Sequence, residues 1–136
     1  AGQLVRQCLA SLVPAGIVYG RGRCSLATQR DFWDGRQFIC GHNPGVPAEY
    51  SVLVARVTAD DGEMLGSIVS YACHPTTLAW QNHLISPDWV GAFYQTVEGA
   101  TGGLAMFLQG ASGELQPART YTDDLEMSRA QGRQRG

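Results

Sequence analysis

One segment limits the fold more than any other: two apolar runs joined by a short acidic turn. Residues 51–58 are rich in β-branched side chains, with Val52, Val54 and Arg56 on one side and Leu53, Ala55 and Val57 on the other, which is typical of a strand. Residues 64–73 form a second apolar run, and Asp60-Asp61-Gly62 between the runs is a hairpin signal. The second run has enough Ile, Val and Tyr for the interior of a sheet. The sequence therefore predicts an antiparallel hairpin with a central second strand.

Helices are predicted on both sides of this hairpin. Residues 3–13 repeat Leu and Val at helical spacing, and Pro14 ends the pattern. After the hairpin, Ser86 can cap a second helix and Pro87 suits its first position. Four apolar residues at helical spacing are expected to form the buried stripe of that helix: Val90, Phe93, Tyr94 and Val97.

The remaining segments complete a mixed layer of helices and strands. We expect a short strand at 17–19, a buried strand at 104–108 and a helix beginning near Thr122. Residues 31–49 predict a long ordered loop, which three aromatic side chains would pack: Phe32, Trp33 and Phe38. The predicted fold class is α/β or α+β, with part of a mixed β-sheet flanked by helices.

Composition and charge exclude several kinds of protein. With 44% apolar and 16% charged residues the chain is globular in type. A net charge of -2 gives no electrostatic basis for binding nucleic acid, and no apolar run is long enough for a transmembrane segment. Every basic residue is Arg, which with abundant Ala and Gly suggests a GC-rich bacterial genome and assigns no compartment. The start at Ala1 favours an internal fragment of a longer protein.

The cysteines give no sign of a zinc-finger site. Close pairs such as Cys-x2-Cys are absent from the sequence, and the four cysteines are widely spaced: Cys8, Cys24, Cys40 and Cys73. An even count permits disulfides, but we expect reduced, mostly buried thiols. Cys73 is the strongest case because it closes the predicted central strand.

His74 is the best single candidate for chemistry. It follows the central strand and precedes Pro75, which cannot donate to a sheet ladder, so the strand should end near it. Neutral imidazole is the commonest metal ligand in proteins. The alternative is a core histidine that is hydrogen-bonded to backbone. His42 and His83 lie in loop-like contexts and are expected to be ordinary surface or packing residues.

Two other features could contact a substrate. Arg30 has a planar guanidinium suited to a carboxylate or an oxyanion, and the alternative is a salt bridge with Asp31 or Asp34. The turn from Gly110 to Gly113 could present peptide N–H groups to a substrate oxygen. Ser112 within that turn lacks the Gly-x-Ser-x-Gly elbow, which argues against a covalent serine mechanism.

Several blocks of the chain resemble the neutral/alkaline, non-lysosomal ceramidase family. The similar blocks cover roughly residues 20–120: Ala27-Thr28-Gln29-Arg30, Tyr71-Ala72-Cys73-His74-Pro75-Thr76-Thr77-Leu78, Asn82, Ile85-Ser86-Pro87-Asp88 and Phe107-Leu108-Gln109-Gly110-Ala111-Ser112-Gly113-Glu114-Leu115-Gln116-Pro117. The resemblance implies that residues 1–120 are part of a catalytic domain. Residues 121–136 would then be a truncated or poorly ordered C-terminal segment.

The resemblance also implies a reaction, which is hydrolysis of an N-acyl amide with one Zn²⁺. His74 would be one zinc ligand, and Arg30 would lie near the zinc and the substrate. A second histidine, a Glu and a Tyr would come from the rest of the same polypeptide, outside residues 1–136. The expected partner is a small-molecule or lipid amide. Two alternatives stay open: a metal-free pseudoenzyme or binding module, and a metal-dependent esterase or deacylase with a non-lipid substrate.

The sequence departs from the family at one position that matters. The family has Gly-Asp-Val-Ser-Pro where this chain has Gly113-Glu114-Leu115-Gln116-Pro117, so Gln116 occupies the place of the active-site serine. Glutamine can donate and accept hydrogen bonds but cannot act as a nucleophile. We expect Gln116 to contact the substrate. Ceramide specificity is the property that this change puts in question.

Overall fold

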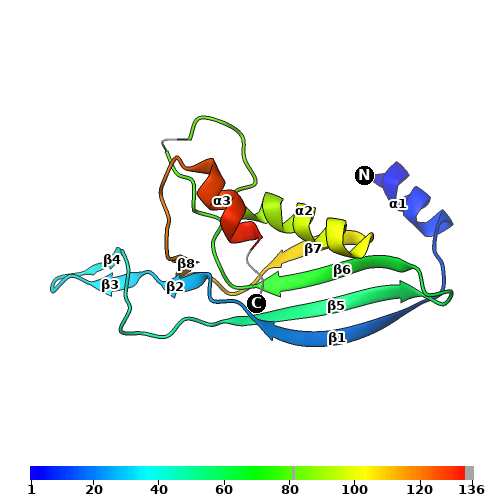
Figure 1. Cartoon of the computed structure of the whole chain (residues 1–136), viewed down its shortest axis with the longest axis horizontal. Helices are drawn as coiled ribbons and strands as arrows, with labels where there is room; N and C mark the ends of the chain where they lie inside the picture. Colours follow the sequence, from blue (N-terminus) through cyan, green and yellow to red (C-terminus); the bar gives the residue numbers. More distant parts are fainter. Residues whose placement is uncertain (81, 134–136) are drawn as a thin grey trace.

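A four-stranded mixed sheet forms the centre of the structure, a computed structural model that describes residues 1–80 and 82–133 (Figure 1). Its strands are β1 (Ala15–Arg23), β5 (Ser51–Ala59), β6 (Met64–Tyr71) and β7 (Leu104–Gln109), in the order β1-β5-β6-β7. Strand β5 is antiparallel to both β1 and β6, and β7 runs parallel to β6. The predicted mixed sheet is confirmed, and its class is α+β.

The predicted hairpin is present as β5 and β6. Gly62 in its turn has φ 92, a left-handed conformation that glycine adopts without strain. Strand β6 lies inside the sheet as expected, although it ends at Tyr71 and not at His74. Strand β1 is longer than the predicted 17–19, because its backbone pairs with β5 along its whole length, through Gly20 and Gly22.

Helix α2 (Trp89–Thr101) connects the parallel strands β6 and β7, and helix α3 (Leu125–Gly132) packs against it (Figure 1). Two details of the second helix differ from the prediction. The cap is Asp88, not Ser86, and its carboxylate accepts a hydrogen bond from the Trp89 N–H at 2.7 Å. Trp89 and Ala92 are its most buried residues, whereas the predicted stripe is half-buried.

The other predicted helix and the last sheet strand carry exposed apolar side chains. Helix α1 (Gly2–Ala10) ends earlier than predicted, has no buried residue and stands apart from the sheet in Figure 1. On β7, Leu104, Met106 and Leu108 are exposed, so the prediction of a buried strand is wrong. The reason is position: β7 is an edge strand, and these side chains lie on the sheet face opposite α2.

Four short strands extend from the end of the sheet. β2 (Ala27–Gln29) pairs with β8 (Leu115–Pro117), and β3 (Asp31–Trp33) pairs with β4 (Phe38–Cys40), all antiparallel. Residues 31–40 therefore form a small hairpin where a loop was predicted. Trp33 and Phe38 contact each other with ring centroids 5.2 Å apart, but all three aromatic residues of this segment are exposed.

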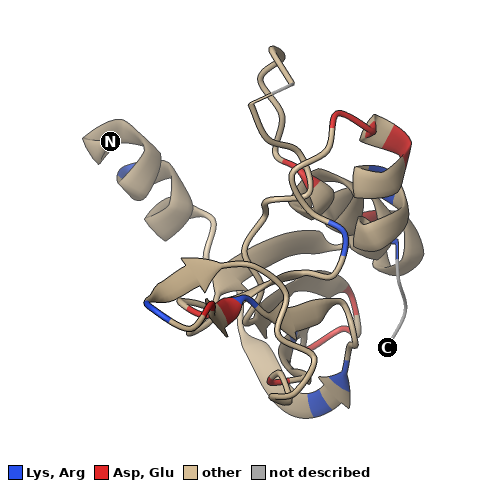
Figure 2. Ribbon diagram, turned by 90° about the vertical axis from the view of Figure 1, so that its left-hand side faces the viewer, with Lys and Arg blue, Asp and Glu red and all other residues tan. Residues whose placement is uncertain are grey.

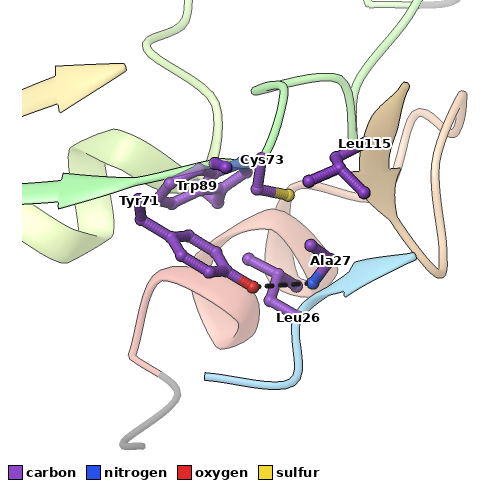
Figure 3. Packing of buried hydrophobic residues seen from close by; sticks show 7 residues of the cluster. Leu26, Ala27, Tyr71, Cys73, Trp89 and Leu115 are labelled. Atoms are coloured by element: carbon purple, nitrogen blue, oxygen red, sulfur yellow. Dashed lines mark hydrogen bonds between the residues drawn. The ribbon is translucent and has the colours of Figure 1, made fainter. Parts of the chain in front are cut away.

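The core lies where the sheet end meets the β2–β8 pair. Figure 3 shows Tyr71 and Trp89 beside Cys73 and Leu115, with Ala27 opposite. Cys73 is fully buried as predicted, and burial raises the pKa of its thiol. The other cysteines are free thiols too, but Cys8 and Cys40 are exposed, so the expectation of mostly buried thiols is wrong.

Charged residues are few and are scattered along the ribbon in Figure 2. No helix in the described part of the chain is long and apolar enough to cross a bilayer.

Candidate active site

His74 follows shortly after the end of β6, and hydrogen bonds to its backbone and its ring fix it. Its peptide N–H donates to the Leu115 carbonyl at 3.1 Å, and its own carbonyl accepts from the Trp89 indole at 3.2 Å. The ring Nδ1 also lies 2.9 Å from the Leu115 carbonyl oxygen. A carbonyl can only accept, so Nδ1 carries the hydrogen and Nε2 keeps its lone pair. This ring-to-backbone bond is the one that the core-histidine alternative expected, and a histidine that binds a metal can also make it through its second ring nitrogen.

Arg30 lies on the other edge of strand β8. Its peptide N–H donates to the Glu114 carbonyl at 2.8 Å, and its carbonyl accepts from the Gly41 N–H at 2.7 Å. Because His74 bonds to Leu115 from the opposite side, one short strand separates the two candidate residues. The Arg30 Nε donates to the Gly113 carbonyl at 3.0 Å. Among the described residues it forms no salt bridge with an aspartate, so the alternative interpretation of Arg30 is not realised.

The turn that starts at Gly110 is held tightly at one end and is open at the other. The Gly110 N–H donates to the Tyr71 carbonyl at 3.0 Å, and a Cβ at Gly110 would lie 3.0 Å from the Ala72 nitrogen. Glycine therefore permits the close approach of turn and strand. Gly113 is exposed, with open space around its Cα. Ser112 is 6% exposed and its hydroxyl accepts from the Gln109 amide, which leaves it poorly placed as a nucleophile.

Gln116 has hydrogen-bond partners at both ends of its side-chain amide. The residue is 3% exposed. Its Nε2 donates to the Gly41 carbonyl at 2.9 Å, and its Oε1 accepts from the Cys40 thiol at 3.6 Å. The Gln116 amide therefore serves the protein's own hydrogen bonding in this conformation.

Two residues near Arg30 and Gln116 were not among the site residues predicted from the sequence: Cys40 and Tyr121. The Cys40 sulfur lies 3.2 Å from the Tyr121 hydroxyl. That contact raises the pKa of Tyr121, and the nearby Arg30 guanidinium opposes the rise. The two residues are 81 positions apart, and neither lies in a recognisable motif. The sequence held no local signal that could have paired them.

The candidate metal ligand stands alone in the described part of the chain. No group of three His, Cys, Asp or Glu side chains there is arranged as it would be around a metal ion. His42 and His83 lie in loops and are exposed. The described residues thus bring together one oriented imidazole, one guanidinium, an open turn and a buried amide.

The fold and this arrangement define a class: an α+β protein with polar side chains gathered where the central strand of a mixed sheet ends. A scan against protein-family models found no match. The chain is 33% identical over 120 residues to the neutral ceramidase of Pseudomonas aeruginosa, a match that covers 83% of this chain and 18% of that protein.

The fold of the chain is also similar to solved ceramidase structures. The crystal structure of neutral ceramidase from Pseudomonas aeruginosa matches with a TM-score of 0.72 at 23% identity, over 96% of this chain and 22% of the other. A ceramidase complexed with C2 matches with a TM-score of 0.71, over 93% of this chain and 22% of the other. The predicted resemblance to the neutral ceramidase family is confirmed. The chain spans about a fifth of the length of these relatives.

Proposed function

We propose that this chain contributes part of the active site of a metal-dependent hydrolase that cleaves a linear amide. The observation that carries the proposal is the orientation of His74, whose Nδ1–H is directed to the Leu115 carbonyl. Histidines that bind metals usually donate their second ring nitrogen to a carbonyl or carboxylate in this way. The free Nε2 is then the ligand atom. The relationship to the neutral ceramidases supports the reaction class.

His74 is a suitable ligand for Zn²⁺, which accepts imidazole nitrogen readily. The backbone bonds around it hold its Cα and ring before any metal binds, which reduces the cost of ordering the ligand. Further ligands would come from outside residues 1–136, as the family resemblance implies. A zinc ion at this position would supply Lewis-acid chemistry, polarising a carbonyl and lowering the pKa of water to about 7.

Arg30 and the turn would hold the substrate oxygen. The Arg30 side chain is fixed through Nε by the Gly113 carbonyl and its guanidinium also interacts with the Tyr121 hydroxyl, and we assign its other N–H groups to an oxygen that gains negative charge. The Gly110 N–H is already used, so Gly110 shapes the turn. The peptide N–H groups from Ala111 to Gly113 make no backbone hydrogen bond within the described residues and are the donors that we assign to the substrate.

The presence of Gln116 in place of the family's serine determines which substrates we would compare. A serine at this position would offer a small hydroxyl, whereas the Gln116 amide is buried and bonded at both ends. We therefore assign it a positioning role, not the direct substrate contact that the sequence suggested. This difference favours comparing ceramide with non-lipid amides and with esters, which keeps the esterase or deacylase alternative in the same experiment.

The test is the metal content of the full-length protein together with its activity on that substrate panel. We expect about one zinc per chain in the parent protein, and loss of both zinc and hydrolysis in His74→Ala. The matched control is His42→Ala, which removes an exposed loop imidazole and should change neither.

Two results would contradict the proposal. Stoichiometric zinc that survives in His74→Ala would show that His74 is not a ligand. A parent protein without zinc would favour the metal-free binding module.

A further inference from the structure

We propose that Tyr121 is a specificity-determining residue of this site, and that Cys40 and Gln116 orient its hydroxyl through one directional chain of hydrogen bonds. The inference rests on the proposed amide-hydrolase function. It assigns the hydroxyl missing at position 116 to a different residue, 5 positions later in the chain.

The direction of these hydrogen bonds follows from the Gly41 carbonyl, at which the series begins. The Gly41 carbonyl can only accept, so the Gln116 amide must direct Nε2 toward it, at 2.9 Å. The opposite orientation would bring two oxygens together. Oε1 of Gln116 therefore points to Cys40, whose single thiol hydrogen is donated to it. The Cys40 sulfur then has only acceptor capacity left for its other partner, the Tyr121 hydroxyl at 3.2 Å.

This order makes the Tyr121 oxygen an acceptor. Its single hydrogen is donated to Cys40, and the Arg30 guanidinium engages one lone pair of the oxygen, which leaves the second lone pair for another donor. A phenol oxygen in this state binds a substrate N–H or O–H group. Arg30 beside it offers only donors, which suit a carbonyl oxygen. The pair is thus complementary to a secondary amide, which presents both kinds of group.

The backbone and the ring of Tyr121 are constrained as well. Its φ is 56, an uncommon conformation for a residue with a side chain, and such strain concentrates at functional sites. Its N–H donates to the Thr76 carbonyl at 3.0 Å, close in sequence to His74. The ring stacks on Trp80 with centroids 5.7 Å apart and planes at 20°. Trp80 is 74% exposed, so the stack lines the solvent side of the site.

The experiment has one readout that needs activity and one that does not. In the full-length, metal-loaded protein, Tyr121→Phe should raise KM for a secondary N-acyl amide about 3- to 10-fold, as for one lost hydrogen bond. KM for the N-methyl amide, which lacks the N–H, should not change. Cys40→Ala should repeat the effect of Tyr121→Phe, and Cys40→Ser should restore the parent KM. Tyr19→Phe on the exposed sheet face is the matched control.

The second readout is a double-mutant cycle on urea unfolding with Cys40→Ala and Tyr121→Phe. Linked residues should be non-additive by about 2-fold or more in the unfolding constant. Additive effects would overturn the hydrogen-bond chain. Non-additive effects with unchanged KM would overturn the substrate contact. A parent protein that is inactive on every amide would refute the proposed function and the substrate contact that rests on it. The double-mutant cycle needs no activity, so it would still test the hydrogen bonds between Gln116, Cys40 and Tyr121.

Discussion

The Tyr71 hydroxyl joins the main sheet to the strand pair that holds Arg30, and Tyr71→Phe should break this link. The hydroxyl accepts from the Ala27 N–H at 2.8 Å and donates to the Cys24 carbonyl at 2.9 Å (Figure 3 shows the first bond). Ala27 is fully buried, and its N–H faces Tyr71 and not β8, because the backbone bonds across the pair are made by its neighbours, with Leu26 bonded to Ala118 and Arg30 to Glu114.

The expected loss follows from these two bonds. A buried donor left without a partner costs about 1–3 kcal/mol, and the second bond contributes about 0.5–1.5 kcal/mol net. Tyr71→Phe should therefore lower the free energy of unfolding by about 1.5–4.5 kcal/mol, a large part of the ~5–15 kcal/mol that a domain has. Urea unfolding measures it, and hydrogen exchange should show a faster Ala27 amide. Tyr19→Phe, at an exposed tyrosine, should stay within about 0.5 kcal/mol.

The pH dependence gives an independent check. Burial is the largest cause that raises the pKa of Tyr71 above its ordinary value of about 10. The unfolded chain then loses this proton first, so the stability from Tyr71 is complete below about pH 10 and declines as pH rises further. Above that pH the gap between parent and Tyr71→Phe should narrow by about 1.4 kcal/mol per pH unit. A difference below about 0.5 kcal/mol at pH 7, or a gap that is constant up to pH 11, would refute this reasoning.

Two further substitutions test the supports of the site. Gly110→Ala should destabilise the protein by about 1–3 kcal/mol in urea unfolding, because the new methyl group would meet the backbone of Tyr71 and Ala72. The control Gly113→Ala places its methyl group in open space and should be nearly neutral in the same assay. Asp88→Ala should lower the free energy of unfolding by about 1–2 kcal/mol, because the Asp88 carboxylate accepts from both the Trp89 and the Leu78 N–H groups at 2.7 Å. Thermal or urea unfolding measures the loss. A variant as stable as the parent would show that the cap contributes nothing.

Local patterns predicted those parts of the fold that local interactions determine. The β5–β6 hairpin was predictable because alternation and the Gly62 turn lie within one short stretch. The helix after His74 was predictable from its cap region and apolar spacing. The extension of β1 through Gly20 was not, because glycine has weak strand preference and the pairing partner lies in β5. The depth of Trp89 also depends on a distant neighbour, Phe107.

In the candidate site, too, some features could be predicted from local sequence and others depend on distant residues. The position of His74 shortly after the central strand was accessible from sequence, since Pro75 sets a limit to pairing, although pairing already stops at Tyr71. Its ring orientation depends on the Leu115 carbonyl, 41 residues away, and so needed the structure. Gln116 shows the limit most clearly, because its residue type suggested a substrate contact while its burial and two partners give it an internal role.

Strand β8 links the two halves of the proposed chemistry through its backbone. The Leu115 carbonyl holds the candidate metal ligand on one edge, and the Glu114 carbonyl holds Arg30 on the other. Because these bonds use main-chain atoms, the separation of His74 and Arg30 does not depend on which side chain stands at position 116. A serine can then be replaced by glutamine without moving either group. What changes is the polar group offered near Arg30, and in this protein Tyr121 is the residue that we expect to supply it.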